Sequence, residues 1–200
     1  MDRGYQKIFW GLLLVTFHLN LGAIQLLPPF IGWLILISGI RELSHRFENS
    51  SIATDSFHRG GTIAKALVVL TLLSTIASIA IGRDISESPV FMYYPMLIIT
   101  LEIIVFFHVL EGTHQIFSTL GFEERALEAS KKLRTYLVFA LTSAILLIFA
   151  LFFNHSPTMI IGLMTAIIAV IYLLVYLNQL KNFWMEDPLG KPILDESGRM

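Results

Sequence analysis

An acidic residue interrupts one of the most apolar stretches of this sequence. The segment "LIITLEIIVFFHVLEGTH" runs from Leu97 to His114, and eleven of its first fourteen residues are apolar. Glu102 lies in the middle of this run. A charged side chain near the centre of a membrane costs at least about 2.5–3.5 kcal/mol on insertion scales. An acid at this position is therefore a polar link between helices, a site for a proton or a cation, or an acid that reaches the membrane surface along the lipid.

We expect the carboxyl group of Glu102 to be neutral at pH 7. Tyr94, at the predicted outer edge of this helix, lies eight residues earlier, which places Glu102 about 12 Å deeper along the helix axis. No Lys or Arg occurs at a matching depth in another predicted helix, and burial disfavours the charged form. The proton of this acid needs an acceptor. Hydroxyl groups at similar depth are the candidates: Thr71, Ser74, Thr75, Thr142 and Ser143.

A second group of ionisable residues lies at the polar end of the same segment. His108, Glu111 and His114 form the pattern His-x-x-Glu-x-x-His. Steps of three residues place all three side chains within a sector of roughly 120° around a helix. Histidine and carboxylate are ligands for zinc, iron or manganese, but the two histidines lie about 9 Å apart along the axis. Polarity at a membrane surface is the favoured interpretation, a metal site is the alternative, and no cofactor is expected.

The composition of the chain indicates a membrane protein. Its 200 residues are 55% hydrophobic and only 14% charged, whereas soluble domains carry about 25% charged residues. A soluble domain of this length has too little interior to bury so much apolar surface. The net charge of −1 provides no attraction to nucleic acid. Because the chain has no cysteine, disulfides, thiolate chemistry and Cys-ligated metal sites are excluded.

Six membrane-spanning helices are predicted, in one domain over residues 1–184. Four apolar segments are separated by polar breaks, and each is long enough to cross about 30 Å of hydrocarbon. The N-terminal apolar run is divided by Pro28 and Pro29, which disrupt a helix interior but are tolerated in its first turn. This run predicts two short helices, with one span plus a re-entrant segment as the alternative. The predicted helices cover residues 5–19, 28–43, 62–81, 90–114, 133–153 and 158–180.

The distribution of basic residues predicts an orientation. Lysine and arginine concentrate in the cytoplasmic segments of membrane proteins. With six helices and both termini inside, 13 of the 14 lysines and arginines are cytoplasmic, and Arg83 is the exception. With five helices, Arg3 and Lys7 would also lie outside. The sequence thus predicts an all-α, polytopic protein of the cell membrane, with three helical hairpins and both termini in the cytoplasm.

Three segments have predicted conformations on the cytoplasmic side. The polar stretch 44–61 is expected to be a flexible loop. Residues 112–134 are expected to form a helical hairpin broken near Gly121, because "FEERALEASKKLRTY" has the pattern of a helix with favourable Glu–Lys pairs. The tail 185–200, with two prolines and few apolar residues, is expected to be disordered.

Small residues mark one predicted packing face. Ser74, Ser78 and Gly82 recur at every fourth position, and this spacing lets two helix backbones approach closely. We expect a contact within one bundle, with a homodimer interface as the alternative.

A polar group also lies between the first two predicted helices. It consists of His18, Asn20 and Gln25 in a linker without charged residues. These side chains are expected to cap helix ends, and the alternative is a small external vestibule.

The segment "AIQLLPPFIGWLILISGIREL" (residues 23–43) resembles a family of small, uncharacterised integral-membrane proteins of Gram-positive bacteria. In that family a short first helix is followed by a second that begins with an Ile-Leu-Pro-x-Phe-Ile-Gly type of sequence. The Leu-x-Gly at 110–112, followed by the amphipathic stretch 121–134, is also similar. Pro29 departs from the family, in which an acidic residue is common at this position. The resemblance implies a topology but no activity.

These features favour a non-enzymatic accessory component of a bacterial membrane complex, such as a subunit, regulator or assembly partner. The alternative is a small oligomeric transporter or channel that uses Glu102 as a proton or cation site. The break at the two prolines supports this alternative, since interrupted helices build many substrate sites. An intramembrane enzyme is least favoured, because no nucleophile–base pair is present. The expected partners are the lipid bilayer and either another membrane protein or a second copy of the chain.

Overall fold

The structure is a computed structural model that describes residues 2–16, 20–21, 24–25, 28–47, 51–81, 94–153 and 155–186. These residues are almost entirely helical, as the sequence predicts. The helices are α1 (Asp2–Thr16), α2 (Pro29–Arg46), α3 (Ser51–Ile81), α4 (Tyr94–Thr119), α5 (Glu123–Phe153) and α6 (Ser156–Glu186). Between α1 and α2, the two-residue strands β1 (Asn20–Leu21) and β2 (Ile24–Gln25) form one antiparallel pair.

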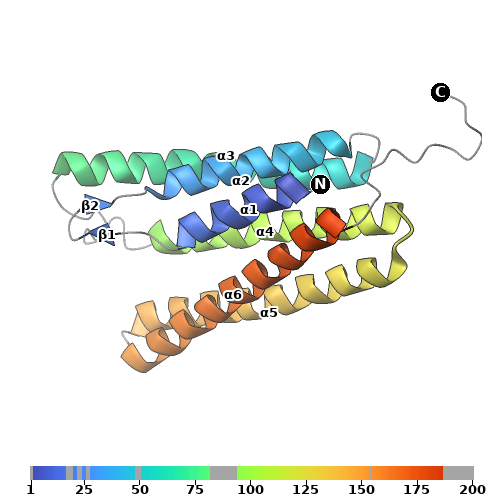
Figure 1. The fold of residues 1–200 in the computed structure, drawn as a ribbon. Helices are drawn as coiled ribbons and strands as arrows, with labels where there is room; N and C mark the ends of the chain where they lie inside the picture. The colour runs from blue at the N-terminus through green and yellow to red at the C-terminus, as the bar shows by residue number, and fades with distance from the viewer. Residues whose placement is uncertain are drawn as a thin grey trace, which may run out of the picture.

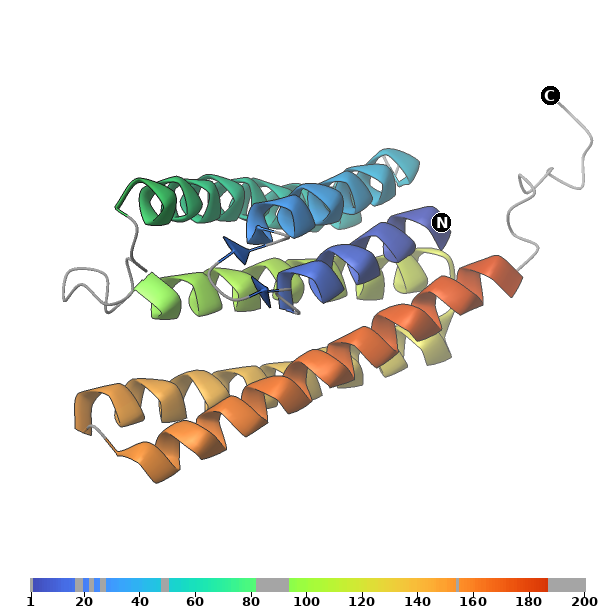
Figure 2. The same cartoon turned by 60° about the vertical axis from the view of Figure 1, so that its left-hand side comes forward.

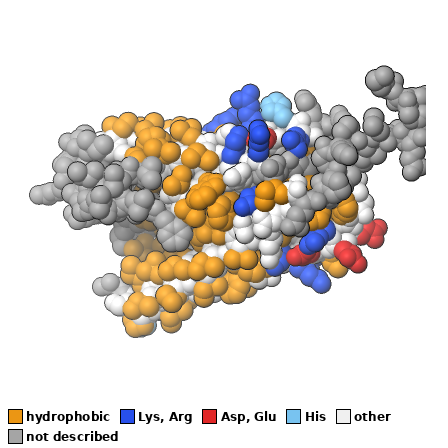
Figure 3. Space-filling model, in the orientation of Figure 1, with side chains coloured by type: hydrophobic (Ala, Val, Ile, Leu, Met, Phe, Trp, Pro, Cys, Tyr) orange, Lys and Arg blue, Asp and Glu red, His pale blue; other side chains and the backbone are white. Residues whose placement is uncertain are grey.

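The six helices form a closed ring in sequence order. Each helix packs against the next one along the chain, and α6 packs against α1. Consecutive helices run in opposite directions (Figures 1 and 2). We call the end of the bundle with the α4–α5 turn at Gly121 the charged end, and the end with the α5–α6 turn at His155 the apolar end. Figure 3 shows charged side chains gathered toward the charged end and hydrophobic side chains over the other half.

Four helices, α3 to α6, are long and apolar enough to cross a membrane. Helices α5 and α6 expose many large apolar side chains to their surroundings, including those of Ile145, Phe152 and Ile160. Such a surface is unfavourable in water and suits a lipid environment. Helices α1 and α2 are shorter, with 15 and 18 residues.

Glycines bring α1 and α2 into direct backbone contact. A Cβ atom added at Gly39 of α2 would lie 2.6 Å from the carbonyl oxygen of Gly4 in α1. A Cβ atom added at Gly11 of α1 would lie 2.7 Å from the carbonyl oxygen of Gly32 in α2. The two glycines of each helix are seven residues apart, which is two helical turns, so both lie on the same face. Close approach through small residues is a common way for apolar helices to associate.

The expectation of a flexible loop over residues 44–61 is wrong for nearly all of its described residues, because α2 continues to Arg46 and α3 begins at Ser51 rather than at Thr62. Although many residues of this stretch are polar, one face of the helix that they form is apolar and buried. Phe57 is fully buried, and its ring lies against Gly112 of α4, where an added Cβ would be only 2.9 Å away. This packing extends α3 beyond its apolar segment and fixes the helix against α4.

The turn between α4 and α5 depends on the conformation of Gly121. Its φ is +77°, and α5 begins two residues later, at Glu123. A left-handed conformation costs a residue with a Cβ roughly 1–2 kcal/mol. No atom lies within 4 Å of an added Cβ at this position, so the cost of a side chain there comes from the backbone alone.

Gly121→Ala is therefore expected to lower the free energy of unfolding by roughly 1 kcal/mol. The melting temperature of the detergent-solubilised protein would measure this loss. Gly121→Asn serves as the control, since asparagine adopts this conformation more readily, and it is expected to retain most of the stability. If Gly121→Ala and Gly121→Asn lost equal stability, the left-handed backbone conformation at this position would not be the cause of the loss.

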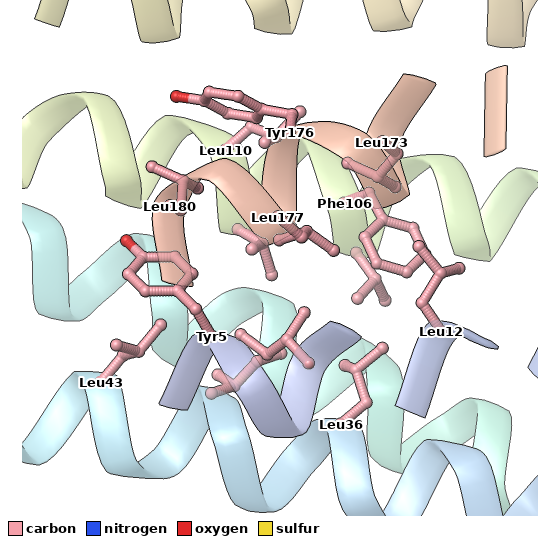
Figure 4. Packing of buried hydrophobic residues seen from close by; sticks show 14 of the residues in the cluster. Tyr5, Leu12, Leu36, Leu43, Phe106, Leu110, Leu173, Tyr176, Leu177 and Leu180 are labelled. Atoms are coloured by element: carbon pink, nitrogen blue, oxygen red, sulfur yellow. The ribbon is translucent and has the colours of Figure 1, made fainter. Parts of the chain in front are cut away.

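The core at the charged end closes the ring between α1, α4 and α6. The hydroxyl of Thr113 in α4 donates to the carbonyl oxygen of Val109 at 2.8 Å, so the hydroxyl of Tyr5 in α1 donates to Thr113 Oγ1 at 3.0 Å. Figure 4 shows Tyr5 next to leucines of α6 and α2. The rings of Phe117 in α4 and Trp184 in α6 stack with centroids 5.6 Å apart. These contacts hold the first and last helices together.

Candidate functional site

A cavity of about 210 Å³ lies between α1, α4, α5 and α6. The polar residues that line it are Glu102, Thr16, Tyr136 and Ser143. The apolar residues that line it are Leu12, Val15, Ile99, Ile103, Phe106, Ala140, Ala166, Ala169, Val170 and Leu173. Among the described residues, Glu102 is the only carboxylate in this wall, and no Lys, Arg or His lines it. The cavity is therefore an apolar space with one acidic group.

Helix periodicity places Glu102 on the cavity side of α4. Ile99, Ile103 and Phe106 line the same cavity, and steps of three and four residues put all four side chains on one face of the helix. Helix α1 ends at Thr16, which also lines the cavity. The end of the short first helix and the acid of α4 therefore lie at the same level in the bundle.

The carboxylate of Glu102 takes part in no hydrogen bond or ion pair with another residue that the structure describes. Three of the hydroxyls expected to act as its partners donate to main-chain carbonyl oxygens instead. These bonds are Thr71 to Leu67 at 2.7 Å, Thr75 to Thr71 at 2.8 Å, and Ser143 to Gly162 at 3.0 Å. A fourth candidate, Thr142, is exposed on α5. The geometry thus disfavours Glu102 as a polar link between helices.

Two aromatic rings line one side of the cavity, and a third ring packs against one of them outside the cavity. The ring of Phe106 contacts that of Tyr136 from α5 in an edge-on arrangement, with centroids 6.4 Å apart. On its other side, Phe106 contacts the ring of Trp33 in α2, with centroids 6.3 Å apart. Trp33 is fully buried between helices. This row of rings fixes Phe106 and Tyr136 beside Glu102.

His108, Glu111 and His114 lie toward the charged end of α4 and do not converge on a common point. His108 Nδ1 lies 3.6 Å from Glu111 Oε2. His114 Nδ1 donates to the carbonyl oxygen of Ala126 in α5, at 2.8 Å. In the described part of the chain, no three His, Asp or Glu side chains are grouped so that they could hold a metal ion. His114 thus joins α4 to α5.

The polar group between α1 and α2 is described only in part. His18 lies outside the described residues. Asn20 pairs with Gln25 across the β1–β2 pair, through the backbone. The roles of these three side chains as caps or as an external vestibule remain predictions.

The predicted packing face of α3 is likewise only partly described. Ser74 is half-buried, Ser78 lies within α3, and Gly82 lies outside the described residues. A close backbone approach in the described residues is seen instead at the four glycines of α1 and α2.

Ala140 of α5 and Ala169 of α6 line the cavity but were not singled out by the sequence analysis, although a signal for them exists. Ala140 and Ser143 of α5 are three residues apart, and so are Ala166 and Ala169 of α6. Small residues at this spacing leave room between helices. They line the same cavity as Glu102, so small side chains of the last two helices contribute to the space that the acid borders.

Together, these features define a class of protein: a ring of six helices, four of them of membrane-spanning length, with an apolar cavity between α1, α4, α5 and α6 whose described lining holds one acid. Comparisons with protein-family models, with curated proteins and with solved structures find no match for this chain. The resemblance to a Gram-positive membrane-protein family therefore stays a prediction, and the function is argued from the site alone.

Proposed function

We propose that the chain is a multi-pass protein of the bacterial cell membrane with six spans and both termini in the cytoplasm. The asymmetry of basic residues supports this orientation, and the charged end would face the cytoplasm. The short helices α1 and α2 would cross as a pair in which the backbones touch. A local thinning of the bilayer around this pair would accommodate their length.

A reporter fused after Gly82 is expected to score as external, because this position follows the third span. Reporter activity in intact cells measures the side directly. The control is the same reporter fused after Glu186, which is expected to score as cytoplasmic. A cytoplasmic signal from the first fusion would contradict the six-span topology.

Within this topology we infer that the protein moves a proton or a cation through the Glu102 cavity. The observation that carries this proposal is a carboxylate in a cavity lined by four helices, with no hydrogen bond or ion pair to another described residue. Intramembrane acids that face a cavity are typical of ion and proton pathways.

The charge balance of the site suggests how it would operate. In an empty apolar cavity the neutral form of the carboxyl group is favoured. A cation that enters the cavity favours the ionised form, because an opposite charge nearby stabilises it. One proton would leave for each monovalent cation bound, so the total charge of the site would not change. The site is thus suited to the exchange of a proton for a cation.

Glu102→Gln is expected to abolish this exchange. Purified protein is placed in liposomes that contain a pH-sensitive dye, and Na⁺, K⁺ or an organic ammonium ion is added outside in separate experiments. The unchanged protein is expected to release protons in response to at least one of them, and the Glu102→Gln protein is expected to respond like empty liposomes.

Glu111→Gln is the matched control for that experiment. It makes the same chemical change in the same helix, about 13 Å away along the axis, outside the cavity lining. It is expected to leave the exchange unchanged. If no cation caused proton release by the unchanged protein, the proposal of exchange would be wrong.

A second candidate function is an accessory component of a larger membrane complex. It is favoured by exposed apolar side chains at the charged end, which lipid would not cover. Leu120 lies in the α4–α5 turn, and Leu127 of α5 is 59% exposed. A second protein that co-purifies in mild detergent at a fixed ratio, and that is lost in Leu127→Asp, would support this role.

A further inference from the structure

We propose that the Glu102 cavity binds an organic monocation with an apolar body, such as a protonated arylalkylamine, in preference to Na⁺ or K⁺. This inference rests on the proposed function in one respect, because it names the kind of cation that the site would take. It is carried by the chemistry of the cavity wall and by its size.

The wall has too few oxygen atoms for a bare metal cation. Such an ion gives up its water only where several oxygen ligands replace it, as the carbonyl oxygens of a potassium-selective filter do. The cavity is lined by four residues with side-chain oxygens, against ten that are apolar. One of those four, Ser143, already donates its proton to Gly162. An ammonium group needs fewer partners, because its own apolar body occupies the rest of the space.

The aromatic side of the cavity fits such a ligand. Phe106 and Tyr136 line the wall together with Glu102, and the row of rings behind them holds them in place. Aromatic faces attract organic cations through the ring quadrupole, and the attraction is larger where water is excluded. A carboxylate next to aromatic rings in an apolar space favours an ammonium head on a hydrophobic body over a hydrated ion.

The volume of the cavity limits the size of the ligand. An apolar cavity of about 150 Å³ is large enough to bind benzene. The cavity here measures about 210 Å³, so it accommodates one aromatic ring with a short aminoalkyl arm. The space depends on the small side chains of Ala140, Ala166 and Ala169. Leucine at one of these positions would occupy much of it.

The test is calorimetric titration of the full-length protein in nanodiscs with 2-phenylethylammonium chloride, with empty nanodiscs as the blank. The neutral analogue 2-phenylethanol and the chlorides of Na⁺ and K⁺ are titrated in parallel. We expect saturable binding of the amine, and binding of the alcohol at least about tenfold weaker because it lacks the charge. Titrations in buffers of different ionisation enthalpy are expected to show release of about one proton per amine, as the exchange of one charge for another requires.

Variants test the role of the Glu102 carboxyl group separately from the role of the cavity volume. Glu102→Gln is expected to weaken amine binding at least about tenfold, and Glu111→Gln is expected to leave it unchanged. Ala166→Leu is expected to abolish binding of the amine by filling the cavity while the protein remains folded. Should Ala166→Leu fail to fold, the smaller change Ala166→Val takes its place and is expected to weaken binding.

The outcomes of these experiments can be distinguished from those of the liposome assay. If Na⁺ or K⁺ bound more tightly than the amine, this would overturn the inference and leave the proposed exchange intact. Saturable, Glu102-dependent amine binding without proton release in liposomes would overturn transport and support the ligand class. Equal binding of the amine and the alcohol, or amine binding that Glu102→Gln does not change, would overturn the inference.

Discussion

Gly39→Ala is expected to lower the melting temperature of the detergent-solubilised protein by about 4–10 °C, for a loss of about 1–3 kcal/mol. The added methyl group would lie 2.6 Å from the carbonyl oxygen of Gly4 and 3.0 Å from the backbone nitrogen of Ile8. These are backbone atoms of α1, which move only if the whole helix moves. The change would therefore separate α1 from α2 and weaken the contact of α1 with the rest of the ring.

Gly61→Ala is the matched control for this prediction. It is the same substitution in another helix, and its added methyl group would lie 3.5 Å from Ile40 Cγ2, an ordinary contact. Because alanine favours helix by about 1 kcal/mol over glycine, this variant is expected to be as stable as the unchanged protein or slightly more stable. Equal losses in both variants would show that the close approach of α1 and α2 does not control stability.

The second large effect is expected at Glu102. Glu102→Leu should raise the free energy of unfolding by about 1–3 kcal/mol, since it removes a polar group without a partner from an apolar cavity. The same change should abolish proton release in the liposome assay. A residue that reduces stability and is required for activity is typical of a functional site. Melting temperature and exchange rate would be measured on the same preparation.

The control for this pair of measurements is Glu111→Leu. Glu111 is 34% exposed, and its Oε2 lies 3.6 Å from Nδ1 of His108, which is 15% exposed. This separation is too long for a hydrogen bond, so a small change in stability and an unchanged exchange rate are expected. If Glu102→Leu lowered the melting temperature below that of Glu111→Leu, Glu102 would be a structural link between helices.

The arrangement of the ring explains why the cavity lies at this level of the bundle. Toward the charged end, Tyr5, Thr113 and Trp184 fill the space between α1, α4 and α6. The last turns of α1 contribute Leu12, Val15 and Thr16 to the cavity wall. The small residues Ala140, Ala166 and Ala169 of α5 and α6 line the same cavity. Small side chains of the last two helices are thus part of what creates the site.

The sequence by itself determined the helical class of the protein and identified Glu102 as an unusual residue, an acid within an apolar segment. Long apolar segments between polar breaks predict helices of membrane-spanning length, because each backbone polar group must be satisfied within its own segment. The glycine-containing break at Gly121 was also readable from the sequence, since it needs only local conformation. An acid inside an apolar run stands out for the same local reason.

The tertiary structure decided what surrounds these features. Whether residues 51–61 are loop or helix depends on Phe57 meeting Gly112, a contact between distant parts of the chain. Three expected partners of Glu102 donate to main-chain carbonyl oxygens instead: Thr71 and Thr75 within their own helix, and Ser143 to Gly162 of α6. The cavity needs four helices at once, and periodicity within one helix does not reveal which faces meet. The physical reason is that packing between helices, and not the pattern within each, determines which side chains share a space.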